Sequence, residues 1–367
     1  MQQPVNPLLK ALLSPLSLLY GIGVFLRNLC FEWGIFKSQE FLFPVISVGN
    51  ITVGGTGKTP HVEHIVSFLK DQFRVAVLSR GYKRRTSGFV VASVASGVDD
   101  VGDEPLQIKK KFPSVEVAVD EKRVRGIRKL CLYNRKLEAF VLDDAFQHRW
   151  VRPGLSVLLV DYNRPLNKDT LLPAGRLREF VSAKNRAEIV VVTKCQPDIK
   201  PIERRIMMTE LNLFPWQSLY FTSFSYGDPL PVFGEGLPFP EREELKETKP
   251  HILMVTGIVS PRPLKKHLRS ISPKIKQFTF PDHHKFTRRD IDMIGNAWNS
   301  LGEKSKFVMT TEKDAMRLQK IGHIEPEIKK NMYYIPVTIQ FVEGTGASFK
   351  NKITEYVGKN KKDHILC

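Results

Sequence analysis

The residues best suited to chemistry form a glycine-rich stretch at positions 52–60, TVGGTGKTP. An apolar run at 43–48 precedes it and an amphipathic pattern follows, so we expect it to lie between a strand and a helix. In that context it has the form of a Walker A loop, whose backbone N–H groups and lysine surround the phosphates of a nucleoside triphosphate. The predicted phosphate-binding residues are Thr52, Val53, Gly54, Gly55, Thr56, Gly57, Lys58 and Thr59.

Two residues of this loop have specific expected roles. Lys58 is predicted to reach the β- and γ-phosphates, and the Thr59 hydroxyl is predicted to bind Mg²⁺. Thr52 departs from the pattern, which has glycine at that position. The following hexapeptide GGTGKT retains the residues that the chemistry requires.

A second nucleotide element is predicted at residues 139–144, AFVLDD, an apolar strand that ends in two acids. One of Asp143 and Asp144 is expected to hold the magnesium ion, directly or through water. Apolar strands that end in aspartate are common in α/β proteins, so this signal gains its weight from the glycine-rich loop.

The tetrapeptide GDEP at residues 102–105 places two carboxylates at a predicted helix start. Asp103 could accept the proton of an attacking hydroxyl group, and Glu104 could face the metal ion. The alternative interpretation is an acidic helix cap without a catalytic role.

The sequence PDHH at residues 281–284 follows another predicted strand. A histidine there could assist a base or bind phosphate, and the alternative is a pair of surface histidines. A zinc site is not favoured, because no spaced ligand set accompanies the pair. Arginine-rich stretches at residues 79–85, 121–123 and 172–179 suit phosphate recognition, although most such arginines are solvated.

The composition narrows the class of partner. Lys and Arg number 56 against 38 Asp and Glu, which gives a net charge of +18 and favours nucleic acid, an acidic membrane or a phosphorylated substrate. No nucleic-acid-binding motif is present. The four cysteines are too far apart for a disulfide framework, which favours a reducing cytosol. They are Cys30, Cys131, Cys195 and Cys367.

Residues 11–26 form the most apolar stretch and lie between Lys10 and Arg27. Sixteen helical residues would span about 24 Å, less than the roughly 30 Å hydrocarbon core of a bilayer. We therefore expect an interfacial helix that enters one leaflet, with basic residues at the lipid phosphates. A buried core helix, a transmembrane span and a secretory signal are the alternatives.

Apolar runs that alternate with helical patterns predict an α/β fold, a P-loop NTPase-like parallel sheet flanked by helices, with a second, smaller α/β block. Strands are predicted at 43–48, 74–78, 89–92, 115–119, 139–143, 156–161, 188–193, 251–256, 276–280, 306–310 and 332–337. The expected domains are a membrane-interface helix at 1–37, a P-loop core at 38–228, a Pro- and Gly-rich linker at 229–250, a C-terminal block at 251–350 and a basic tail at 351–367.

Taken together, the motifs resemble the lipid A 4'-kinase family, the tetraacyldisaccharide 4'-kinases. The resemblance runs from the N-terminal apolar segment to about residue 337. It rests on FPVISVGNITVGGTGKTP (43–60), LSRGYKRR (78–85), VGDEP (101–105), VLDDAFQHR (141–149), LLPAGRLRE (171–179), VVTK (191–194), VTGI (255–258), FPDHH (280–284) and TTEKDA (310–315).

The resemblance implies a kinase that moves the γ-phosphoryl group of ATP, with Mg²⁺, to the 4'-hydroxyl of an acylated glucosamine disaccharide 1-phosphate to form lipid IVA. It implies an anionic membrane surface as partner, at the cytoplasmic face of the inner membrane with peripheral or monotopic attachment, and no nucleic acid or obligate protein partner. The roles implied are Asp103 as base with His283 as its partner, Lys58 and Arg178 in catalysis, Thr59, Glu104, Asp143 and Asp144 at the metal, and Arg123 and His148 at the substrate.

Two small departures from the family pattern are Ala145 and Lys83, where glycine is frequent. They put the loop geometry around Asp144 in question, because an added Cβ restricts φ. Two other functions remain open at the level of sequence. One is a P-loop kinase of a soluble small molecule, and the other is a binding protein switched by a nucleotide.

Overall fold

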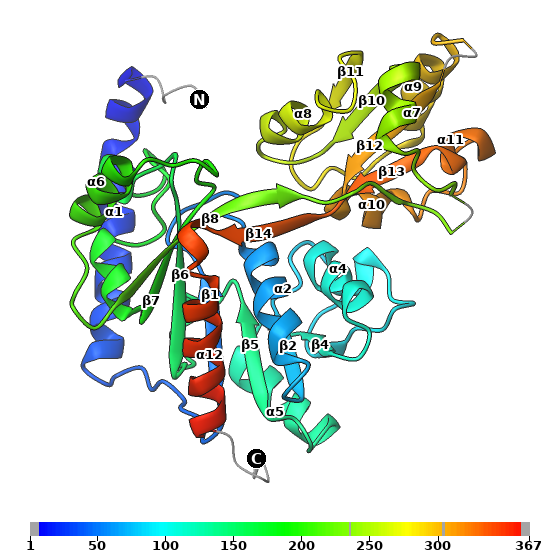
Figure 1. The fold of residues 1–367 in the computed structure, drawn as a ribbon. Coiled ribbons are helices and arrows are strands. Elements are labelled where there is room, and N and C mark those ends of the chain that lie inside the picture. The colour runs from blue at the N-terminus through cyan, green and yellow to red at the C-terminus, as the bar shows by residue number, and fades with distance from the viewer. Residues whose placement is uncertain (1–6, 235, 303–304, 361–367) are drawn as a thin grey trace. The chain divides into compact units, whose positions relative to one another are not determined.

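The structure is a computed structural model that describes residues 7–234, 236–302 and 305–360. The chain forms two compact units (Figure 1). The first contains the described residues up to Phe224 together with those from Ile339 onward, and the second extends from Ser225 to Thr338. The expected α/β class with a large parallel sheet and a smaller second α/β block is confirmed.

A nine-stranded sheet forms the centre of the first unit, in the order β14-β8-β7-β6-β1-β5-β2-β4-β3. Pairing is parallel from β8 through to β4, and β3 is antiparallel to β4. The strands are β1 (Val45–Gly49), β2 (Val75–Ser79), β3 (Val90–Val91), β4 (Glu116–Val119), β5 (Ala139–Asp143), β6 (Leu155–Asp161), β7 (Ile189–Thr193), β8 (Ser218–Tyr226) and β14 (Val337–Phe341). The last two continue across the boundary between the units.

Helices cover both faces of this sheet, as expected for parallel strands that are apolar on both sides. They are α1 (Pro7–Glu32), α2 (Lys58–Leu69), α3 (Val98–Val101), α4 (Asp103–Lys111), α5 (Arg123–Tyr133), α6 (Pro201–Leu211) and α12 (Gly346–Asn360), with short 3₁₀ turns η1 (Leu166–Lys168), η2 (Val181–Arg186) and η3 (Val342–Gly344). On one face, Leu78 and Phe140 pack with Ile127 of α5. The alternate residues Val77 and Val141 are fully buried on the other face.

The second unit has a five-stranded sheet in the order β11-β10-β12-β13-β9. Its strands are β9 (Leu230–Pro231), β10 (His251–Thr256), β11 (Ile275–Thr279), β12 (Lys306–Thr311) and β13 (Met332–Ile335). Its helices are α7 (Arg242–Thr248), α8 (Arg262–Leu268), α9 (Arg288–Asn299), α10 (Glu312–Leu318) and α11 (Pro326–Lys330). β9 is antiparallel to β13, and the other pairs are parallel.

Two expected boundaries differ from the structure. Residues 229–250, expected as a linker, contain β9 and α7, and Leu245 is buried in the core of the second unit. Residues 339–360, expected in the C-terminal block and the tail, belong to the first unit. Both predictions rested on amino-acid composition. They were wrong because these Pro- and Lys-rich segments contain a few apolar side chains that are buried in a core. Residues 361–367 of the expected tail lie outside the described part of the chain.

The packing of α12 explains why it belongs to the first unit. Phe349, Ile353 and Val357 recur at helical spacing and are fully buried. The Tyr356 hydroxyl lies 3.2 Å from the backbone N and 3.3 Å from the backbone O of Val45, in β1. α12 therefore covers the strand that leads into the glycine-rich loop.

α1 is longer than the sixteen residues expected. It has 26 residues and a length of about 39 Å, so the length argument against a membrane span was wrong. Within the described chain it is the one helix with the length and hydropathy to cross a membrane. One side of α1 nevertheless contacts the rest of the first unit, because Ser17 donates to Leu171 O (3.1 Å), Tyr20 to Arg178 O (2.9 Å) and Arg27 to Gln147 O (2.9 Å).

The packing of α12 gives a first prediction. Phe349→Ala should lower the free energy of unfolding of the first unit by about 3–5 kcal/mol, because it leaves a cavity in a closed core. Tyr133→Ala, at an exposed site on α5, is the matched control and should cost less than about 1 kcal/mol. Equal effects in urea unfolding would show that α12 does not belong to the folding unit of the sheet.

Candidate nucleotide and phosphoryl-transfer site

The glycine-rich loop connects β1 to α2, at the carboxyl edge of the parallel sheet where ligands bind in open α/β folds. Gly57 has φ +87°, and a Cβ there would lie 2.7 Å from Phe224 Cζ, so only glycine fits. The Asn50 side chain donates to Thr56 Oγ1 at 2.9 Å and closes the loop from inside. The strand, loop and helix context expected from the sequence is therefore present.

Thr52 is accommodated because its part of the loop is extended. It forms an antiparallel bridge with Leu177, Val53 N–H donates to Arg176 O at 2.8 Å, and Arg178 N–H donates to Ile51 O at 2.8 Å. Thr52 is not among the residues with positive φ, so its Cβ causes no backbone strain. The segment that carries Arg178 is thereby fixed beside the loop.

Sequence reasoning missed the residues that support the loop from the neighbouring strands. Thr193 Oγ1 donates to Thr56 O at 2.9 Å, and Lys194 Nζ donates to Gly55 O. Lys194 also pairs with Asp161 at 2.7 Å, and burial lowers the pKa of Lys194. Asp161 and Thr193 are the last residues of β6 and β7, so the strand-end signal that identified Asp143 could have identified them.

Asp143 ends β5 and is buried. Ser79 donates to its Oδ2 at 3.1 Å, and its Oδ1 has no hydrogen-bond partner among the described residues. Burial contributes most to raising the pKa of Asp143, the charges of Asp144 and Glu104 add to the rise, and Lys58 opposes it, so that the resulting pKa is about 6. A buried carboxylate oxygen without a donor, beside other carboxylates, matches the oxygen ligands that Mg²⁺ prefers.

Asp144 meets two cations. The Lys58 ammonium and the Arg178 guanidinium both lie 3.5 Å from its Oδ1, and Arg178 also lies 3.4 Å from Gln147 Oε1. Asp144 has φ +48°, which turns its side chain out of the strand direction, while the following Ala145 is buried. The structure thus brings together Lys58, Asp144 and Arg178 from three separate motifs.

Asp103 and Glu104 form the first turn of α4, after Gly102 with φ +92°. A Cβ on Gly102 would lie 3.1 Å from Tyr82 O, so glycine is needed at this tight turn. Gly102 is the cap, so the two acids are not capping residues themselves. Asp103 is buried and Glu104 is half-buried. The charge of Glu104 raises the pKa of Asp143, so the Glu104 carboxylate interacts electrostatically with the end of β5.

A buried ionic contact joins the two helices that begin at this edge. Glu63 of α2 accepts hydrogen bonds from Gln107 at 2.8 Å and from Lys111 at 2.7 Å, both on α4. Burial raises the pKa of Glu63 and Lys111 opposes that shift. Since α2 begins at Lys58 and α4 at Asp103, this contact fixes the two starting residues relative to each other.

Arg123 and His148 support the end of β5 from the other side. The Arg123 side chain is buried and donates to Asp120 O at 2.7 Å and Asp143 O at 3.2 Å. Burial lowers its pKa to about 10. His148 Nε2 accepts the Arg123 backbone N–H at 3.3 Å, and burial together with Arg123 lowers the pKa of His148 to about 4. His148 is therefore neutral at pH 7.

His283 lies in the second unit, whereas the other predicted site residues lie in the first. It follows β11 with φ +59°, and its ring nitrogens lie 2.9 Å from Lys313 Nζ and 3.3 Å from Arg317 Nη2. Arg317 pairs with buried Asp314 at 2.9 Å, which also accepts the Gly257 N–H at 2.9 Å. The neighbouring His284 instead bonds Asp290 at 2.8 Å. The two histidines thus have different environments, and the network around His283 was not predicted.

A glycine-rich loop between a buried strand and a helix, with lysine, arginine and carboxylates at one edge of a parallel sheet, defines the class as a P-loop-type kinase. The family model described as tetraacyldisaccharide-1-P 4'-kinase matches residues 9–357. The chain therefore belongs to the tetraacyldisaccharide-1-P 4'-kinase family, and it is an enzyme of the kinase class.

Individual relatives agree with this assignment. The chain is 46% identical to a tetraacyldisaccharide 4'-kinase of Phocaeicola vulgatus, over 96% of both chains. It is 46% identical to a protein of the same name from Bacteroides fragilis, over 96% of this chain and 95% of the relative. A crystal structure of LpxK from Aquifex aeolicus in complex with ATP is similar, with a TM-score of 0.73, 30% identity, and coverage of 95% of this chain and 99% of that chain.

The contact between α2 and α4 gives a second prediction. Glu63→Ala removes the acceptor shared by Gln107 and Lys111 and should lower the free energy of unfolding by about 3 kcal/mol. Asp71→Ala, which breaks the exposed Lys70–Asp71 pair, is the control and should cost less than about 1 kcal/mol. Urea denaturation measures both, and losses of similar size would contradict a structural role for Glu63.

His148 gives a prediction of pH dependence. Its folded-state pKa of about 4 is below the ordinary value of 6.5, so the neutral form is favoured by folding. The stability this provides is complete above pH 6.5 and is lost as the pH falls towards 4. Between pH 6.5 and pH 4 the free energy of unfolding should therefore fall less in His148→Gln than in the wild type. We expect a difference of roughly 1–2 kcal/mol, a value reduced to allow for solvent screening of the partly exposed ring. An imidazole that titrates near 6.5 in NMR spectra would contradict this.

Proposed function

We propose that this kinase transfers the γ-phosphoryl group of ATP to the 4'-hydroxyl of an acylated glucosamine disaccharide 1-phosphate, which yields lipid IVA for lipid A biosynthesis. The observation that carries the proposal is the meeting of Lys58, Asp144 and Arg178 beside buried Asp143, in a chain of this family. Relatives at 46% identity carry the name of this activity, and the similar Aquifex structure is a complex with ATP.

The glycine-rich loop is the proposed binding site for the ATP phosphates. Its N–H groups and the positive end of α2 suit an anion, and Lys58 supplies a mobile charge. Mg²⁺ would be held by Thr59, Glu104, Asp143 and Asp144, and when bound it neutralises charge on the phosphate oxygens. Asp143 Oδ1, which has no hydrogen-bond partner in the described part of the chain, and the raised pKa of that residue support this donor set.

Asp103 is the proposed general base. It is a buried carboxylate at the start of a helix, and the Glu63 contact fixes that helix against α2. It would orient the sugar hydroxyl for in-line attack and accept its proton. Arg178 would stabilise negative charge on the transferred group, since its guanidinium already lies beside Asp144. Arg123 and His148 would shape the acceptor side of the site.

The acyl chains of the acceptor require a membrane, and α1 is the proposed attachment. Its outer side exposes Leu8, Leu12 and Leu18, and its apolar stretch at residues 11–26 lies between Lys10 and Arg27. The polar contacts of Ser17 and Tyr20 with the first unit favour a monotopic or peripheral arrangement over a complete span. The proposed location is the anionic cytoplasmic face of the inner membrane.

The proposed substrate class is tested with paired acceptors. Purified enzyme with labelled ATP and Mg²⁺ should label a detergent-dispersed acylated disaccharide 1-phosphate much faster than the same disaccharide after removal of its acyl chains. Equal or faster labelling of the soluble acceptor would contradict a lipid substrate and support a kinase of small soluble molecules. ATP binding without labelling of either acceptor would favour a nucleotide-switched binding protein.

The general base gives a further prediction. Asp103→Asn should lower kcat by about 10²–10⁴ while ATP binding is retained, because the variant keeps the size of the side chain but loses its basicity. Asp100→Asn, in the preceding α3, is the control and should stay close to wild type. Wild-type kcat in Asp103→Asn would overturn the role.

His283 is proposed as the partner of Asp103 in function. If the two act together, His283→Ala should lower kcat in the wild type and should have little additional effect in Asp103→Asn. Additive losses would assign His283 a separate role.

A further inference from the structure

A group of exposed apolar side chains lies on α6 and the loop that follows it, apart from the site described above. It consists of Ile202, Ile206, Met208, Phe214 and Trp216, and we call it the α6 patch. Ile202 and Trp216 are 59% and 52% exposed. Single exposed apolar residues are ordinary on protein surfaces, whereas five large ones within fifteen positions mark an interaction surface.

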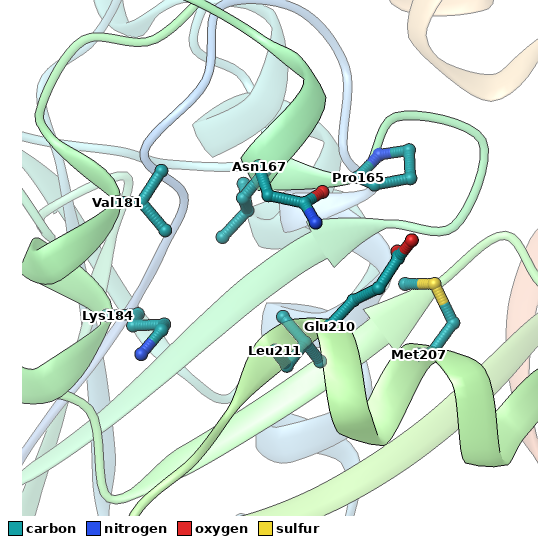
Figure 2. Close-up of a pocket in the computed structure, with 8 residues that line it drawn as sticks. Pro165, Asn167, Val181, Lys184, Met207, Glu210 and Leu211 are labelled. Atoms are coloured by element: carbon teal, nitrogen blue, oxygen red, sulfur yellow. The ribbon is translucent and has the colours of Figure 1, made fainter.

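The orientation of α6 is fixed by its inner side. Met207 and Leu211 are buried in a core cluster of the first unit, and Figure 2 shows them facing Val181 and the Pro165 turn across a small pocket. Since 3.6 residues make one turn, Ile202 and Ile206 must then point outward, away from that cluster. Their exposure therefore follows from the way α6 packs through Met207 and Leu211.

The loop after α6 extends the same exposed surface. The Phe214 and Trp216 rings are stacked, with centroids 5.9 Å apart and planes at 9°. Both rings are exposed, while Gln217 next to them is buried and bonds Ala187 O at 2.7 Å. An aromatic pair held on a fixed backbone is typical of the interface between water and lipid.

The α6 patch belongs to the same side of the first unit as α1. Both helices pack on the segment from η1 to η2: Ser17 of α1 bonds Leu171 O, and Leu171 in turn packs against the cluster that contains Met207 and Leu211. In Figure 1 α1 and α6 overlap in projection at the left of the first unit. α1 and α6 are thus both supported by the segment that contains Leu171.

The charges around the patch suit an anionic surface. Lys200 directly precedes α6 and Arg205 lies in its middle, and both are exposed. Arg205 lies on the outward side together with Ile202 and Ile206, whereas the acidic Asp198 lies before the helix and Glu203 accepts the Lys200 backbone N–H at 2.9 Å. Cations beside aromatic and aliphatic side chains are the composition of helices that lie in a phospholipid headgroup region.

We propose that the α6 patch is a second lipid contact, so that the first unit rests on an anionic phospholipid bilayer through α1 and α6 together. The inference rests on the proposed membrane-bound acceptor. Contact through α1 alone leaves the tilt of the first unit relative to the bilayer less constrained. Two contacts define a plane and hold the carboxyl edge of the sheet at one fixed orientation to the lipid headgroups.

The test uses the full chain and vesicles of phosphatidylethanolamine and phosphatidylglycerol. Ile202→Glu with Ile206→Glu should weaken vesicle partition at least about ten-fold in sedimentation, because two apolar side chains no longer leave water. The matched control is Leu132→Glu with Tyr133→Glu, an exposed apolar pair on α5, which should change partition less than about two-fold. Leu12→Glu with Leu16→Glu reports on α1.

Fluorescence provides a second measurement that does not depend on added charge. Brominated lipid in the vesicles should quench part of the tryptophan emission of the wild type, and Trp216→Phe should remove a measurable part of that quenching. Circular dichroism and thermal unfolding confirm that each variant is folded.

The outcomes separate this inference from the proposed function. Loss of partition in the α1 variant alone, with unchanged quenching in Trp216→Phe, would overturn the α6 contact and leave membrane attachment standing. Unchanged partition in both variants would contradict membrane attachment itself. A change of oligomeric state without vesicles, together with unchanged partition in the α6 variant, would assign the patch to contact between copies and overturn the inference.

Discussion

The structure depends on one electrostatic constraint, the gathering of acidic side chains at the carboxyl edge of a parallel sheet. Asp143 is buried beside Asp144 and Glu104, and burial with this repulsion raises its pKa to about 6. Carboxylates that lie close together in a buried site remain ionised only if cations lie near them. Lys58, Arg178 and buried Arg123 provide these positive charges. Much of the first unit holds these groups in place, from Glu63 between α2 and α4 to Lys194 beneath the loop. Such an edge is suited to receive Mg²⁺ and phosphate.

The sequence predicted what depends on local pattern. The strands at residues 139–143 and 251–256 match β5 and β10, because continuous β-branched runs between turns leave few alternatives. The glycine-rich loop could be found in the sequence because a backbone that wraps around a phosphate requires glycine at positions such as Gly57, where φ is positive. Lys58, Asp144 and Arg178 were each predicted from separate motifs, and their meeting at 3.5 Å is a property of the fold.

The remainder depends on contacts between distant parts of the chain, which a local pattern does not contain. β8 was missed because Ser and Thr alternate with its apolar residues, and α12 because its Lys-rich surface hides Phe349, Ile353 and Val357. The contact in which His148 Nε2 accepts the Arg123 N–H was not predicted, because it joins residues 25 positions apart, and the expected substrate role of His148 stays a prediction. The apolar stretch at residues 11–26 led to a length for α1 that was too short. The helix continues through Arg27 and Asn28, because both side chains form hydrogen bonds with the rest of the first unit.

The central claim is that the acidic edge and the glycine-rich loop of the first unit direct phosphoryl transfer to a lipid hydroxyl. The most direct measurement is the position of the phosphate added to the acylated disaccharide 1-phosphate, determined by NMR of the isolated product. The account predicts one new phosphomonoester, on the oxygen of carbon 4', in an amount equal to the ADP released. A new phosphate on any other oxygen, or ADP released with inorganic phosphate alone, would contradict it.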